Sequence, residues 1–233
     1  MMTVQIDKKT TTAKEQVFSY RKSLKQNNNS VFDKYIRIER YLNRPLASLL
    51  VRAVFRTGIT PNQLTFLSFF LGLGAAVSFS AGKSPFFALG GVLIQLSSIV
   101  DCSDGMLARS KNLCSDYGSH LDLFLDRIVD LFLIAGIAFG AYLFSKDLTL
   151  LVLGLFTAGL YLLQVNLFYI IKSFLGNESR GETGEARALM LFLIFILALF
   201  NRMDVIIYAL FVQTVINNLY RLVSFIRLGK KRE

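Results

Sequence analysis

The sequence has few of the residues that build disulfide frameworks or histidine-dependent sites. Its 233 residues include two cysteines, Cys102 and Cys114, and one histidine, His120. Two cysteines are too few for a disulfide framework, and neither has the neighbouring ligands that a metal site requires. One histidine excludes mechanisms that need two. A Ser-His-Asp triad would have to use His120, which we interpret instead as a polar residue at the start of a helix. There is also no internal repeat, P-loop or dinucleotide-binding fingerprint.

Charged residues are scarce as well. They make up 18% of the chain, against about 25% in soluble domains, and 53% of the residues are hydrophobic. The apolar residues gather in six runs: residues 64–81, 86–100, 131–144, 148–171, 188–200 and 205–216. With the polar residues at its ends included, each run is close to the roughly 17–25 residues that span a bilayer. We therefore predict an all-α integral membrane protein with six transmembrane helices. The alternative is a soluble helical bundle with a large core.

An amphipathic segment, residues 31–57, precedes the first apolar run. Its apolar residues recur at helical spacing and its basic residues form the other face, which is typical of a helix lying in the membrane interface. We expect it to anchor the chain and to be interrupted near Pro45. Thr60 and Pro61 then provide an N-cap and a first helical residue for the first span.

The distribution of basic residues predicts the topology. Twelve of the 26 lysines and arginines lie in residues 1–60, and the loops after the second and fourth runs and the C-terminal end are also basic. Because such residues mark the cytoplasmic side, we place both termini there. The predicted parts are a flexible polar cytoplasmic tail (1–30), the interfacial helix (31–57), a six-helix transmembrane domain (58–227) and a basic cytoplasmic tail (228–233).

The net charge of +10 thus has a membrane explanation. Nucleic-acid binding is the other use of such a charge, but the sequence has no nucleic-acid fold signature and no soluble domain that combines basic and aromatic residues. We expect an anionic membrane surface, or an anionic substrate at that surface, and no nucleic acid.

Four aspartates stand between the second and third apolar runs. Asp101 and Asp104 are three residues apart and Asp122 and Asp126 are four apart, so each pair shares one face of a helix. A turn over residues 110–117 would bring the two pairs face to face. Four carboxylates at close range require a counter-charge, and an all-oxygen ligand set favours Mg²⁺ or Mn²⁺. Acids inside membrane helices are costly and are therefore functional candidates.

Arg109 and Gly105 complete this site. An arginine pairs with phosphate oxygens, and a glycine allows the close approach of a ligand. Carboxylates with a cation, an arginine and a glycine describe a site for a diphosphate ester, in which a remaining carboxylate can take a proton from an attacking hydroxyl. The alternative is a transporter or channel whose acids bind a cation.

The motif resembles the signature of the CDP-alcohol phosphotransferase (CDP-alcohol phosphatidyltransferase) family, D-x2-D-G-x2-A-R-x8-G-x3-D-x3-D. The chain fills it without departure, with Asp101, Asp104, Gly105, Ala108, Arg109, Gly118, Asp122 and Asp126. The amphipathic helix, the TPN sequence at residues 60–62 and the six spans are also similar to that family.

The resemblance implies transfer of a phosphoalcohol unit from a CDP-alcohol to a second alcohol, with release of CMP. It implies a metal site at Asp101, Asp104, Asp122 and Asp126, with Asp126 also the base that deprotonates the acceptor. The implied CDP-alcohol site comprises Asp101, Asp104, Gly105, Ala108, Arg109, Gly118, Asp122 and Asn62. The implied partners are CDP-diacylglycerol or a soluble donor such as CDP-inositol, a small alcohol acceptor, membrane lipids and a second copy of the chain.

The acceptor is the least determined partner. The N-terminal sequence is similar to the branch of the family that uses inositol phosphate, and members with phosphorylated acceptors use basic residues near the fifth span. Arg187, Arg180 and Lys172 are the candidates here, although each also serves as a positive-inside residue. Asp116 and Asp130 lie outside the signature. We interpret Asp116 as a solvated loop residue and expect Asp130 to pair with Arg127 or another buried group.

Overall fold

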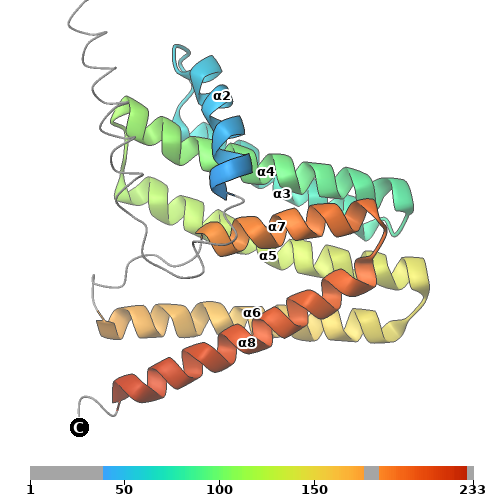
Figure 1. Ribbon diagram of the computed structural model, residues 1–233. Coiled ribbons are helices and arrows are strands. Elements are labelled where there is room, and N and C mark those ends of the chain that lie inside the picture. The colour runs from blue at the N-terminus through green and yellow to red at the C-terminus, as the bar shows by residue number, and fades with distance from the viewer. Residues whose placement is uncertain (1–38, 176–183, 230–233) are drawn as a thin grey trace, which may run out of the picture.

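The structure, a computed structural model, describes residues 39–175 and 184–229. Within them every regular element is a helix (Figure 1): a π-helical turn Glu39–Asn43, α2 Arg44–Val54, α3 Pro61–Ser80, α4 Ser84–Lys111, α5 Asp116–Ser145, α6 Leu148–Leu175, α7 Gly184–Leu199 and α8 Met203–Gly229. The all-α prediction is confirmed. The predicted polar tail, the first part of the predicted interfacial helix and residues 230–233 lie outside the described residues.

Five of these helices are long and apolar enough to cross a membrane: α3, α4, α5, the Leu148–Ile171 part of α6 and the Met203–Val223 part of α8. The prediction of six spans is not confirmed, because α7 is shorter. Its 16 residues rise about 24 Å, less than the roughly 30 Å hydrocarbon core of a bilayer.

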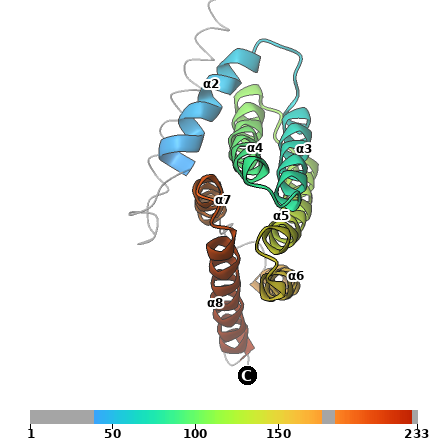
Figure 2. The ribbon, with the colours of Figure 1, turned by 90° about the vertical axis from the view of Figure 1, so that its right-hand side faces the viewer.

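The helices run back and forth in one bundle, which α2 crosses near one end (Figures 1 and 2). The main contacts join α3 to α4 and α5, α4 to α7, and α6 to α5 and α8. The C-terminal end of α4 and the N-terminal ends of α3, α5 and α7 therefore meet at one end of the bundle. The aspartates of the signature lie at this end.

Glycines allow α5 to pack unusually close to α3. A Cβ at Gly136 or Gly140 would overlap the backbone carbonyl of Ala76 or Phe79, and a Cβ at Gly72 would meet Val129. No Cβ fits at Gly136 or Gly140, so the backbones of the two helices lie in direct contact there. Phe79 is completely buried beside this seam, which fixes how α3 and α5 sit relative to each other.

Polar contacts attach the N-terminal elements to the bundle. Asn43 is 1% exposed, donates to Ser98 Oγ at 2.8 Å and accepts from Gln95 Nε2 at 2.9 Å. At the start of α3, Thr60 and Gln63 form a reciprocal capping box, which satisfies free N–H groups of the first turn. The predicted cap at Thr60 and the helix start at Pro61 agree with this geometry.

Candidate active site

The acidic residues lie on two helices joined by a tight turn. α4 continues beyond its apolar run to Lys111, and α5 begins at Asp116 with Ser115 as its N-cap, accepting from Gly118 N. Asn112 ends α4 in the left-handed conformation, at φ 55°, which asparagine tolerates better than most residues. The two helices are thereby antiparallel neighbours, with the Asp101/Asp104 and Asp122/Asp126 pairs near their connected ends.

Three carboxylates converge in what we call the carboxylate cluster: Asp101, Asp122 and Asp126. One oxygen from each lies within 4.8 Å of the others. Asp101 Oδ1 and Asp122 Oδ1 are buried without a hydrogen-bond partner among the described residues. Buried oxygens of this kind are costly unless a ligand satisfies them, and an all-carboxylate donor set suits a hard divalent cation. The residues present therefore fit the predicted metal.

Asp104 is held differently from the other three. It is 7% exposed, and its Oδ2 accepts a hydrogen bond of 2.5 Å from Thr65 Oγ1 on α3. It does not belong to the carboxylate cluster, although it lies close enough to Asp126 and Asp122 to interact with them electrostatically. Thr65 was not foreseen from the sequence, because the pairing spans 39 residues and two helices.

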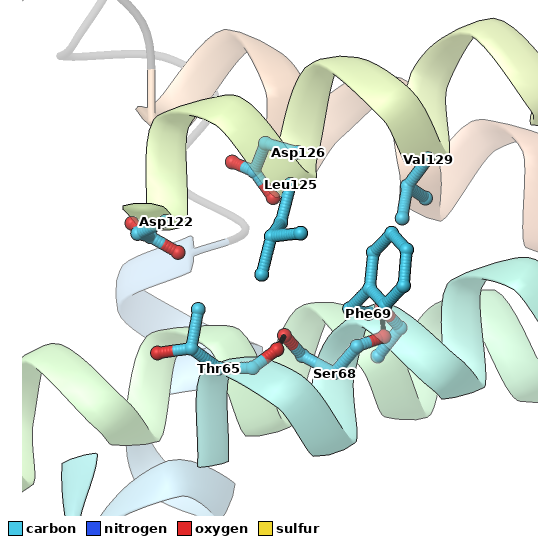
Figure 3. Close-up of a pocket in the computed structure, with 8 residues that line it drawn as sticks. Thr65, Ser68, Phe69, Asp122, Leu125, Asp126 and Val129 are labelled. Carbon is cyan, nitrogen blue, oxygen red and sulfur yellow. Dashed lines mark hydrogen bonds between the residues drawn. The ribbon is translucent and has the colours of Figure 1, made fainter. Parts of the chain in front are cut away.

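A small pocket opens beside the cluster, between α3 and α5 (Figure 3). It is narrow and is lined by Thr65, Ser68, Phe69, Ser97, Asp122, Leu125, Asp126 and Val129. Figure 3 shows the side chains of α5 facing Thr65 and Ser68 of α3 across this space. Its polar end is at the aspartates and its apolar end lies toward Phe69 and Val129.

The glycines of the signature border other predicted site residues. A Cβ at Gly105 would lie 3.4 Å from Arg109 Nη1, so the guanidinium covers this glycine. A Cβ at Gly118 would lie 3.3 Å from Asn62 Oδ1, which brings the start of α3 to the start of α5. Ala108 is half-buried on α4, one turn from the same acids.

Lys111 fixes the loop that leads into α3. Its Nζ donates to the carbonyl oxygens of Thr57 and Ile59, at 3.0 and 2.8 Å. The loop is thus attached to the end of α4, which helps to hold Asn62 beside Gly118. The predicted donor-site residues therefore gather at the same end of the bundle as the aspartates.

Arg187 of α7 reaches directly into the acidic group. Its Nη2 lies 3.0 Å from Asp126 Oδ1 and 3.1 Å from Asp130 Oδ1, and its Nη1 lies 3.7 Å from Asp101 Oδ2. Its Nε donates to both oxygens of Asp130, at 3.1 and 3.4 Å. Of the three predicted acceptor residues, Arg187 is thus adjacent to the carboxylate cluster. Arg180 and the Lys172 side chain lie outside the described part of the chain.

Asp130 is the most buried acid near the site, at 2% exposed. Tyr161 of α6 donates its hydroxyl to Asp130 Oδ2 at 2.6 Å. Arg127 Nη1 lies 3.6 Å from the same oxygen and donates to the Tyr161 hydroxyl at 3.1 Å. The expectation that Asp130 pairs with Arg127 or another buried group agrees with these contacts, but the participation of Tyr161 was missed, because nothing in the sequence around it marks a polar role.

Residues judged unimportant for chemistry lie at the edges of this region. Asp116 is exposed in the first turn of α5, and His120 is exposed with its Nδ1 2.7 Å from the Asp116 carbonyl oxygen. Cys102 and Cys114 do not form a disulfide with each other. The position of His120 agrees with the sequence interpretation. Asp116 is exposed as expected, but it begins α5 and does not lie in a loop.

Comparisons with known proteins point to one family. Residues 58–219 match the family model described as CDP-alcohol phosphatidyltransferase. The chain is 33% identical over 153 residues to archaetidylinositol phosphate synthase of Pyrococcus horikoshii, covering 65% of this chain and 75% of that protein. It is 39% identical over 104 residues to a bifunctional IPC transferase and DIPP synthase of Rubrobacter xylanophilus, covering 45% of this chain and 23% of that protein.

The chain spans about a quarter of the length of the bifunctional relatives that it matches. Among solved structures, the apo form of phosphatidylinositol phosphate synthase from Mycobacterium tuberculosis gives a TM-score of 0.59 at 24% identity. That match covers 76% of this chain and 93% of the other. The two proteins share a fold.

Proposed function

The chain belongs to the CDP-alcohol phosphatidyltransferase family, and from this membership we propose a specific reaction for it. It transfers a phosphatidyl group from a CDP-alcohol, in our proposal CDP-diacylglycerol, to the hydroxyl of a phosphorylated acceptor such as inositol phosphate or glycerol 3-phosphate. CMP is released. The active site and both termini face the cytoplasm, the side on which the basic loops lie, and the enzyme works as a homodimer, as the family resemblance implies.

The position of Arg187 carries the proposal of an anionic acceptor. Its guanidinium lies 3.0 Å from Asp126, the proposed base. A phosphorylated acceptor that must bring its hydroxyl to a group of carboxylates needs a cation to offset the repulsion between like charges. Arg187 supplies that charge at the required place. The name of the Pyrococcus horikoshii relative, archaetidylinositol phosphate synthase, agrees with this choice.

The proposed mechanism assigns a task to each group of residues. Asp101, Asp122 and Asp126, together with the adjacent Asp104, would hold Mg²⁺ or Mn²⁺. When bound, that ion neutralises charge on the diphosphate and on the departing CMP. Thr65 orients Asp104 through its hydrogen bond.

The donor is held at the joined ends of α3, α4 and α5. Arg109 pairs with a phosphate of the CDP unit, and Gly105, Ala108 and Gly118 leave room for the cytidine and ribose. Asn62 contributes an amide at the same place, held there by the loop that Lys111 fixes.

The chemical step uses Asp126. Its carboxylate accepts the proton of the acceptor hydroxyl, whose oxygen attacks the β-phosphorus of the donor. A new phosphorus–oxygen bond forms to the acceptor. The bond between the β-phosphorus and the bridging oxygen breaks, and CMP leaves with that electron pair. The Asp126 side chain is 21% exposed, so an acceptor hydroxyl can approach it.

A donor and acceptor panel tests the proposal. The full chain, purified in detergent with Mg²⁺, is assayed for CMP release from CDP-diacylglycerol with inositol phosphate, glycerol 3-phosphate, serine, free inositol or no acceptor. We expect release only with a phosphorylated acceptor, and none with EDTA. A parallel series with CDP-inositol tests the alternative of a soluble donor. Equal release with serine or free inositol would refute the role given to Arg187.

A further inference from the structure

We infer that Asp130 is a positioning residue: held by Tyr161, it fixes Arg187 so that the guanidinium faces the acceptor side of the carboxylate cluster. This inference deepens the proposed function and rests on it, because it takes the acceptor to be an anion bound by Arg187. Asp130 itself touches neither the acceptor nor the donor in this scheme.

The two edges of the Arg187 guanidinium are used differently. The edge formed by Nε and Nη2 binds Asp130. Nε donates to both carboxylate oxygens, and Nη2 forms an ion pair of 3.1 Å. The other edge points at the cluster, where Nη1 is 3.7 Å from Asp101. That distance is too long for a hydrogen bond, so among the described contacts the Nη1 donors have capacity for the oxygens of a phosphate.

Asp130 is itself fixed by groups from separate helices. Its Oδ2 accepts from Tyr161 of α6 and faces Arg127 of its own helix, while Arg187 comes from α7. Asp130 and Tyr161 are 2% and 7% exposed. Both Asp130 oxygens accept hydrogen bonds, and a buried carboxylate satisfied in this way tends to hold one arrangement. The network therefore sets the position of the Arg187 guanidinium.

Asp130 also limits the competition between Arg187 and a divalent cation for the carboxylates of the cluster. Without Asp130, the nearest anions to Arg187 are Asp126 and Asp101, the carboxylates that the divalent cation needs. An arginine free to move would compete with that cation. Because Asp130 provides a separate negative charge for Arg187, the arginine and a cation can occupy neighbouring positions.

Kinetics of two variants test the inference. Asp130→Asn removes the charge and Tyr161→Phe removes the donor to Asp130, while Asp204→Asn and Tyr169→Phe are matched controls at exposed positions. We expect Asp130→Asn to raise the acceptor KM about tenfold or more, as the loss of a charge-assisted hydrogen bond implies, and Tyr161→Phe to raise it about threefold. The donor KM should change less than twofold. A lower melting temperature with an unchanged acceptor KM would mean that Asp130 is only structural, and would overturn the inference.

Arg187→Gln separates this inference from the proposed function. If Arg187→Gln raises the acceptor KM and Asp130→Asn does not, the positioning role fails while the proposed function stands. If Arg187→Gln has no effect either, both fail.

The rise in melting temperature on acceptor binding tests variants whose turnover is too slow to measure. Inositol 1-phosphate and glycerol 3-phosphate should each raise the melting temperature of the Mg²⁺-loaded unchanged protein and of Tyr169→Phe. The rise should be at least halved in Asp130→Asn. An equal rise in Asp130→Asn, or no rise in the unchanged protein, would overturn the inference.

Discussion

Replacement of Arg187 by glutamine should strengthen the binding of a divalent cation while it weakens the binding of the acceptor. Arg187 is the counter-charge of Asp126 at 3.0 Å and of Asp101 at 3.7 Å. Glutamine keeps a donor for the buried Asp130 but removes the positive charge. The three carboxylates of the cluster would then attract a cation without repulsion from a neighbouring guanidinium.

The size of the effect follows from the distances. Two unit charges 4 Å apart interact by about 1 kcal/mol in water and about 4 kcal/mol near a protein surface. The Arg187 side chain is 17% exposed, so the value near a protein surface is the closer guide, and a divalent ion doubles the interaction. Since about 1.4 kcal/mol corresponds to a tenfold change in affinity, we expect Mn²⁺ to bind at least about tenfold more tightly.

Electron paramagnetic resonance of Mn²⁺ titrated into the purified full chain measures this affinity without any turnover. Arg202→Gln is the matched control, because Arg202 is an exposed arginine paired with Asp204 away from the acidic site. It should leave Mn²⁺ binding unchanged. Equal or weaker Mn²⁺ binding by a folded Arg187→Gln protein would refute the view that the Arg187 charge opposes a cation at these carboxylates.

Three further changes have defined outcomes. Asp126→Asn should lower kcat about 100-fold or more, the usual contribution of a general base, with the melting temperature within a few degrees of the unchanged protein; retained CMP release would contradict the assignment. Thr65→Val should lower kcat about tenfold or more, because it removes a hydrogen bond to a charged group, whereas Thr65→Ser should keep most activity. Gly140→Ala should destabilise the protein by about 1–3 kcal/mol, because its Cβ would overlap the Phe79 carbonyl; Gly159→Ala has open space and should not, as thermal unfolding of both would show.

Features set by neighbouring residues in the chain could be predicted from the sequence. Spacings of three and four residues place Asp101 and Asp104 on α4, and Asp122 and Asp126 on α5, near the turn that joins the two helices. The spacing did not show that Asp104 bonds to Thr65 and lies outside the carboxylate cluster. The apolar runs predicted the helices, and Thr60 with Pro61 predicted the start of α3. Local geometry is enough for each of these, because the periodicity of a helix fixes which residues share a face.

Features that depend on packing between distant helices could not be predicted. Thr65 meets Asp104 across 39 residues, and Tyr161 meets Asp130 across 31. A threonine or tyrosine in an apolar run gives no sign of its partner. The number of spans is not confirmed for a related reason. Hydropathy alone does not show that α7 is shorter than the other apolar helices, nor that Arg187 at its start contacts buried acids.

The Asp130 network has a consequence for how the protein is made. Arg187 follows Asp130 in the chain by 57 residues. At usual translation speeds of roughly 5–20 residues per second, the ribosome therefore adds Arg187 about 3–11 s after Asp130. During that interval Arg127 is the only basic partner already present within the described network. An acid inside a membrane helix is costly until it is paired. The free-energy cost of burying Asp130 in the membrane is therefore not fully offset until α7 has been synthesised. Nascent chains that end before α7 should be preferred targets of membrane quality-control proteases.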